Sequence, residues 1–145
     1  MLKPLHVPSN SAPEWAILGE RVRCLIPGEK TGGAFALFQV SSPAGLGPPL
    51  HVHTREDEVF HILEGEYEFT IEGKAVAARP GDTLFAPRNQ PHTYRCIREG
   101  KMLVQAAPSG FEHFFAAVAD RIGTHLPPDM AVLGGLFEKA GLRLA

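Results

Sequence analysis

The chain of 145 residues is 44% hydrophobic and 21% charged and carries a net charge of −2 at pH 7. These values fit one globular domain over residues 1–145 and exclude the clustered basic surface that nucleic acids or anionic membranes select. No window is apolar enough for a membrane span, and residues 1–13 hold no apolar block as long as that of a signal peptide. Two cysteines, Cys24 and Cys96, are too few to cross-link a fold of this size, so we expect a cytoplasmic, reducing location.

Short apolar runs separated by glycine and proline fill the first hundred residues, and this spacing predicts many strands. The loops that separate the runs are expected at residues 27–33, 41–49 and 87–91. Gly65 marks a break between two strands, and Glu72-Gly73 is suited to a two-residue hairpin turn. The predicted strands, in chain order, are residues 15–18, 21–26, 34–40, 51–53, 59–63, 66–71, 74–78, 83–86, 92–97 and 102–106.

Beyond residue 108 the apolar residues recur at helical spacing. The apolar stripe consists of Phe111, Phe114, Phe115, Val118 and Ile122. Ser109 and Glu112 stand three residues apart, the spacing of a capping box at the start of this helix. Asp129 is expected to cap a second short helix over about residues 130–139, with Gly141 as its stop.

Many short strands followed by a helical tail are typical of an all-β fold, a small closed barrel or jelly roll. We expect the barrel over about residues 15–106 and the helical segment over about residues 109–141. The sequence contains no internal repeat of the length found in solenoids or propellers.

The pair His51 and His53 is the most informative feature of the chain. Residues two apart on a strand point to one face, so both imidazoles can reach a single metal ion. Glu58 can join them only if the polar run of residues 54–57 turns the chain back. His92, far downstream, is the fourth candidate ligand, and three imidazoles with one carboxylate suit a single divalent metal ion.

Neighbouring polar residues could compete for these roles. Glu56 and Asp57 rank below Glu58 as ligands, because Glu58, Phe60 and Ile62 share an inward face that Asp57 would reverse. The remaining histidines are expected outside the site; they are His6, His61, His113 and His125.

Three further groups of residues near the candidate ligands could contribute to a site. Cys96 is expected to be a structural residue rather than a nucleophile. Arg88 and Arg95 are expected at the solvated surface. Phe60 and Tyr94, if inward, would line a pocket that accepts aromatic groups.

Two motifs of this sequence resemble those of the cupin family. The first motif consists of Gly45, His51, His53, Glu58 and Gly65, with every spacing satisfied. The second consists of Gly81, Pro87, Asn89, His92 and Cys96, where Asn89 and Cys96 stand at positions that the family fills with glycine and asparagine. Asparagine tolerates left-handed backbone, so the change at Asn89 is mild. The segment of residues 107–115 is also similar to small single-domain cupins related to quercetin dioxygenases.

The resemblance implies a double-stranded β-helix, the cupin jelly-roll barrel, with a divalent metal held by His51, His53, Glu58 and His92 and often a homodimer. Such a donor set suits Fe, Mn, Co, Ni, Cu or Zn and leaves two positions of a six-coordinate ion open. The outer face bearing Val59, His61 and Leu63 would then need cover from the helical tail or from a second subunit.

Two classes of function fit these residues. The first is a metal-dependent dioxygenase that cleaves a small chelating aromatic or dicarbonyl substrate, with Glu58 both ligating the ion and accepting a proton. The second is a non-catalytic metal- or ligand-binding cupin, and a related alternative is a metal-dependent isomerase or lyase. One metal site serves all of these, so the motifs do not separate them.

Overall fold

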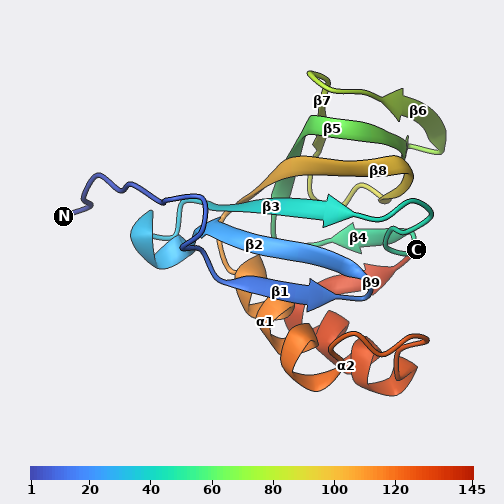
Figure 1. Cartoon of the computed structure of the whole chain (residues 1–145). Helices are drawn as coiled ribbons and strands as arrows, with labels where there is room; N and C mark the ends of the chain where they lie inside the picture. The colour runs from blue at the N-terminus through green and yellow to red at the C-terminus, as the bar shows by residue number, and fades with distance from the viewer.

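The strands form one curved, antiparallel layer in this computed structural model, which describes all of residues 1–145 (Figure 1). The strand order is β1-β2-β3-β8-β4-β9, and β5 pairs with β8, β6 and β7. The bounds are β1 Glu14–Ile17, β2 Glu20–Ile26, β3 Ala36–Ser42, β4 His51–His53, β5 Asp57–Ile71, β6 Lys74–Ala78, β7 Thr83–Ala86, β8 His92–Ala107 and β9 Leu142–Leu144. A mostly β, curled architecture with two short helices near the C-terminus confirms the predicted fold class.

Two long strands replace four of the predicted ones. β5 runs through Gly65 and β8 runs through Gly100, so the predicted breaks are wrong. At Gly65, where φ is +76°, the register of the two strands shifts, and an added Cβ would lie 2.3 Å from the carbonyl oxygen of Glu99. The glycine therefore marks an irregular pairing that bends a continuous strand.

The local signals elsewhere give mixed outcomes. The predicted hairpin at Glu72-Gly73 is confirmed, since both residues have the positive φ that such a turn needs. The loop after β2 contains a short 3-10 helix, Gly28–Lys30. The strand β9, which pairs with β4, was not predicted because three residues are too short to show an alternating pattern.

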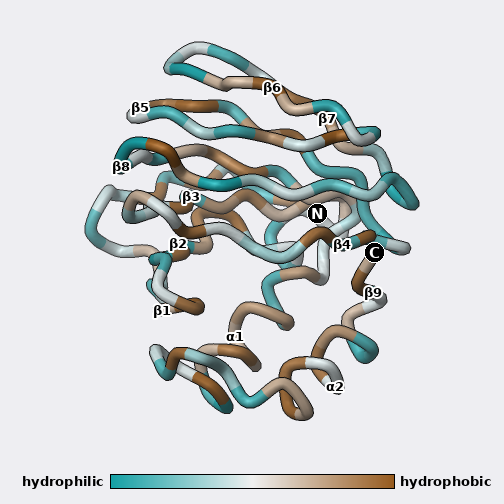
Figure 2. Tube along the Cα trace, turned by 90° about the vertical axis from the view of Figure 1, so that its right-hand side faces the viewer, coloured by the Kyte–Doolittle hydropathy of each residue, from teal (hydrophilic) through white to brown (hydrophobic).

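The two helices, α1 Phe111–Arg121 and α2 Met130–Ala140, lie together beneath the strands, near β1 and β9 (Figure 2). Neither helix is of a length and apolarity that would let it cross a membrane. They cover the inner side of the curved layer rather than the outer face of β5. The helical tail therefore leaves Leu63 on that face 39% exposed.

Hydrogen bonds at the ends of α1 and α2 fix where these helices begin and end and join α1 to the loop after β2. Asp129 caps α2 as predicted, accepting from the backbone N–H groups of residues 131 and 132 at 3.0 and 3.2 Å, and Gly141 ends the helix with φ +77°. The predicted capping box of α1 is wrong, because the cap residue is Gly110 rather than Ser109. Glu112 instead accepts from the N–H groups of Gly110 at 2.6 Å and Gly28 at 2.7 Å. One buried carboxylate thus joins α1 to the loop after β2.

Candidate metal centre

Three strands bring four metal-ligand side chains to one point inside the curved layer. His51 and His53 come from β4, Glu58 from the second position of β5, and His92 from the first position of β8. All four are buried, and one donor atom of each lies within 4.8 Å of the others. Residues 54–56 turn the chain between β4 and β5, which corrects the parity of Glu58 as the sequence predicted. His92 arrives through long-range pairing, since it lies opposite His51 in the register of β4 and β8.

Backbone carbonyls orient two of the imidazoles. The Nδ1 atom of His51 lies 2.7 Å from the carbonyl oxygen of Pro49, and that of His92 lies 3.1 Å from the carbonyl oxygen of Gln90. Each bond holds a proton on Nδ1 and leaves Nε2 as the free donor atom. The Nε2 atoms point inward, with that of His92 3.0 Å from Oε1 of Glu58.

Glu56 orients the third imidazole, a role that the sequence analysis missed. Its Oε1 lies 2.7 Å from Nδ1 of His53, and its side chain is buried. Glu56 lies outside the four-residue cluster, whereas Glu58 belongs to it. Asp57 also lies outside the cluster and pairs with Arg88 at the surface. The available signal was an acidic residue three positions after a histidine. A polar turn is usually exposed, so the sequence did not predict that Glu56 is buried.

The pKa values of the side chains in the cluster are shifted in different directions. Burial, together with the neighbouring imidazoles His53 and His92, lowers the pKa of His51 to about 4. Burial also disfavours a charge on His53, but Glu58 and Glu56 outweigh it and raise the pKa of His53 to about 9. Glu58 is fully enclosed, yet His53 and His92 hold its pKa well below the usual range of a carboxyl group. The site therefore contains an ionised carboxylate beside an imidazole that retains its proton at neutral pH.

These donors fit a divalent transition metal. Nε2 of His53 lies 3.1 Å from Nε2 of His51 and 2.8 Å from Oε1 of Glu58, so several donor atoms crowd around one point. Because Nδ1 of His51 and of His53 each faces an acceptor, the neutral rings turn the lone pairs of their Nε2 atoms toward each other, an arrangement that a cation would relieve. Because the second nitrogen of every imidazole already has an acceptor, each ring is oriented as metal-ligating histidines usually are.

An apolar cavity of about 100 Å³ opens beside the four donors. Phe60 and Tyr94 line it, which confirms their inward orientation. The helices contribute a second set of aromatic walls. Phe111, Phe114 and Phe115 were predicted only as part of a helix stripe, and Phe137 of α2 was not singled out in the sequence. Phe111 lies against His53, with ring centroids 4.7 Å apart. The C-terminal helices therefore form one side of the space that a ligand of the metal would enter.

Another residue missed by the sequence analysis is Glu20, which lines this cavity from the start of β2. The hydroxyl of Tyr94 donates to its carboxylate oxygens at 3.0 and 3.1 Å. No sequence signal marked it, because an acidic residue beside glycine in a hairpin is usually exposed.

The two departures from the second motif have separate outcomes. Asn89 has φ +67°, so it adopts the left-handed backbone expected in place of glycine. Cys96 is buried, and its Sγ lies 3.1 Å from the carbonyl oxygen of Arg98. It does not line the cavity, and burial raises the pKa of its thiol, as expected of a structural cysteine. Cys24 is likewise a free, buried thiol.

The other histidines lie outside the cluster as expected: His6, His61, His113 and His125. The ring of His61 binds the hydroxyl of Thr83 on the outer face of β5. Arg95 is exposed, as predicted. The metal-ligand types of the chain thus converge only at the four predicted residues.

Comparisons with known proteins agree with this geometry. Residues 38–105, which include all four donors, match the family model described as a cupin domain. A quercetin 2,3-dioxygenase of Bacillus subtilis is 30% identical over 114 residues, 77% of this chain and 34% of that protein. The dimethylsulfoniopropionate lyase DddQ of Ruegeria pomeroyi is 45% identical over 78 residues, 50% of this chain and 37% of that protein. The chain therefore spans about a third of the length of these two relatives.

Among solved structures, KdgF from Halomonas sp. superposes with a TM-score of 0.68 at 16% identity, covering 75% of this chain and 99% of that one. At this identity the likeness concerns the fold.

Proposed function

We propose that this cupin is a metal-dependent enzyme, a dioxygenase that cleaves a small chelating aromatic or dicarbonyl substrate with dioxygen. The observation that carries the proposal is the position of the four donors, which stand at the edge of a cavity walled by aromatic side chains. A divalent ion held by His51, His53, Glu58 and His92 would supply a Lewis acid with open positions for substrate and dioxygen. The similarity to quercetin 2,3-dioxygenase supports this choice of reaction.

In this proposal the protein residues bind, orient and accept a proton. The aromatic walls, including Phe60 and Phe111, stack on a planar substrate and exclude water from it. Glu58 accepts the proton of a substrate hydroxyl, because its contacts with the histidines end on Oε1 and leave Oε2 for this purpose. Glu56 keeps His53 in position.

A lyase is the second candidate, because the similarity to dimethylsulfoniopropionate lyase is the higher in identity over its matched residues. It would use the same ion and the same carboxylate without dioxygen. A cupin that only binds metal or ligand is the third reading. The same cavity and donors support all three, so an assay must separate them.

The test is a metal analysis followed by two assays. Purified protein is examined for bound metal by mass spectrometry and then followed in an oxygen electrode with flavonols, diketones and catechols. Oxygen uptake that requires the metal supports the dioxygenase. Loss of dimethylsulfoniopropionate under nitrogen would instead support the lyase, and bound metal with neither activity would favour the binding protein.

We also propose a homodimer that covers the outer face of β5. Phe85, opposite Val59 in the register of β5 and β7, is 56% exposed, and Leu63 on the same face is 39% exposed. The helices do not reach this face. We expect the F85E variant to elute as a monomer in light-scattering chromatography and the wild type as a dimer; equal masses would contradict the proposal. A cytoplasmic location stays a prediction.

A further inference from the structure

Glu20 places a carboxylate in the wall of the metal cavity, apart from the four donors. Besides those donors it is the only charged side chain in the wall, and Tyr94 is the only other side chain there with a polar group. The hydroxyl of Tyr94 donates to both oxygens of Glu20, at 3.0 and 3.1 Å. The cavity thus has two polar regions, the metal-ligand cluster and a carboxylate reached through a phenol.

Glu20 lies among groups that shift its pKa. Burial raises its pKa, although hydrogen bonds from Ser42 and Tyr94 act in the opposite direction. The titratable groups that face Glu20 are Tyr94 and Cys96 from β8 and Tyr67 from β5. The hydroxyl of Tyr67 donates to the hydroxyl oxygen of Ser42 at 2.9 Å. Burial raises the pKa of each of these, so they stay protonated between pH 5 and 8.

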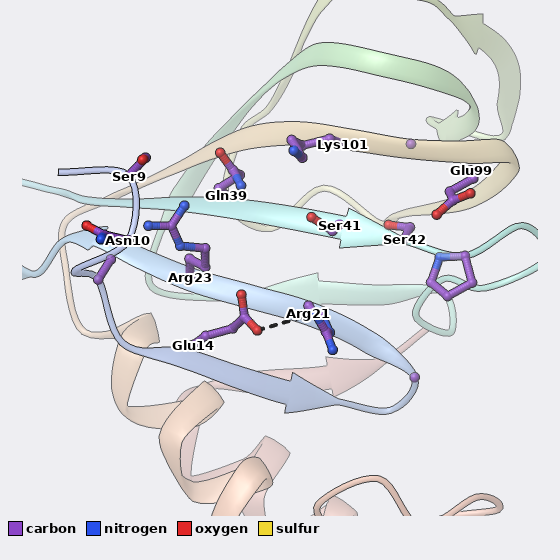
Figure 3. Close-up of a pocket in the computed structure, with 14 residues that line it drawn as sticks. Ser9, Asn10, Glu14, Arg21, Arg23, Gln39, Ser41, Ser42, Glu99 and Lys101 are labelled. Carbon is purple, nitrogen blue, oxygen red and sulfur yellow. Dashed lines mark ion pairs between the residues drawn. The ribbon is translucent and has the colours of Figure 1, made fainter. Parts of the chain in front are cut away.

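Ser42 connects Glu20 to the end of β3. Ser42, which donates to Glu20, also lines a polar groove of about 620 Å³ on the opposite side of β3 from the cavity. Figure 3 shows this groove, with Ser41 and Ser42 near the end of β3 and Glu14 paired to Arg21 beside them. Ser42 therefore contacts Glu20 through its hydroxyl and belongs to the residues that line the groove.

Resting on the proposed function, we propose that Glu20 is a second proton acceptor in the metal cavity. It serves the hydroxyl that Glu58 does not deprotonate in a ligand with two adjacent hydroxyls, such as a catechol. The O–H bond of the ligand breaks and its proton goes to the phenol oxygen of Tyr94, while the proton of Tyr94 passes to a carboxylate oxygen of Glu20. The electron pair of the broken bond stays on the ligand oxygen. The products are a ligand anion, a neutral tyrosine and a protonated Glu20.

The test counts the protons released when 4-nitrocatechol binds to the zinc-loaded protein. Calorimetry in two buffers of different ionisation enthalpy gives this number, and the absorbance of the nitrocatecholate reports its deprotonation. At pH 8 we expect the E20Q variant to release about one proton more than the wild type, because the wild type keeps that proton on Glu20.

Two further variants make the result specific. The Y94F variant removes the phenol that links the ligand to Glu20, so it should also release about one extra proton at pH 8. It also provides an independent test should E20Q fold poorly. The E14Q variant alters an exposed carboxylate on β1 and should match the wild type.

The outcomes separate this inference from the function on which it rests. Wild-type protein that binds zinc and nitrocatechol, with equal proton release from E20Q and Y94F at pH 8, would overturn the role of Glu20 alone. Wild-type protein that binds no zinc, or binds zinc but no nitrocatechol, would overturn the proposed function and the relay with it. An extra proton released by both variants at pH 8 supports the relay.

Discussion

The proton on His53 should make zinc binding depend steeply on pH. Glu58 and Glu56 raise the pKa of His53 to about 9, and Nε2 of His53 must lose its proton before it can bind a metal ion. Below that pKa the proton competes with the metal, so affinity should fall about tenfold for each unit of pH. At pH 7.5 the apparent affinity would then be roughly 30-fold below its value above pH 9, or about 2 kcal/mol.

His51 and Glu58 add to this dependence only in acid. The pKa of His51 is lowered to about 4 and that of Glu58 lies below its usual range, so both are already deprotonated near neutral pH. Zinc binding at pH 7.5 should therefore release about one proton from His53. Further acidification below about pH 6 should release the metal.

The assay is a competition titration with a zinc chelator between pH 6.5 and 9.5, corrected for the protonation of the chelator. The E56Q variant should show a shallower slope, because one of the two carboxylates that hold the proton on His53 has lost its charge. The H61A variant changes a histidine outside the cluster and should keep the wild-type slope. An affinity that stays level across this range, or an ion retained at pH 4, would refute the reasoning.

Three more predictions concern single side chains. The H51A and H92A variants should each lose zinc by mass spectrometry while their circular dichroism stays native, and normal zinc content in both would place the site elsewhere. The E56A variant should bind zinc about 10- to 100-fold more weakly because His53 loses its orienting partner, whereas D57N should bind normally. The D129A variant should lose about 1 kcal/mol of unfolding free energy in urea, since α2 loses its cap; an unchanged midpoint would contradict this.

Local backbone rules were enough to predict much of the fold and three of the four residues in the cluster. The alternation of a strand puts His51 and His53 on one face, and the polar turn after them reverses the parity of Glu58. Asp129 and Gly141 bound α2 through hydrogen bonds within a few residues of themselves. The motif resemblance then supplied His92, because no local rule links it to β4.

Local rules failed where distant segments decide the conformation. Gly65 looked like a strand break, but its contact with the backbone near Glu99 makes it a bend in one long strand. Glu112 looked like half of a capping box, but one of its oxygens binds Gly28, 84 residues earlier. In both cases a partner far along the chain overrode the nearest pattern.

The sequence by itself therefore determined the ligand types, their parity and the ends of α2, because each depends on backbone geometry over a few residues. Only the tertiary structure decided that Glu56 is buried behind His53, that the helices wall the cavity, and that Glu20 meets Tyr94 inside it. Burial and long-range pairing set these contacts and the pKa values that follow from them, and neither can be read from the spacing of residues along one chain.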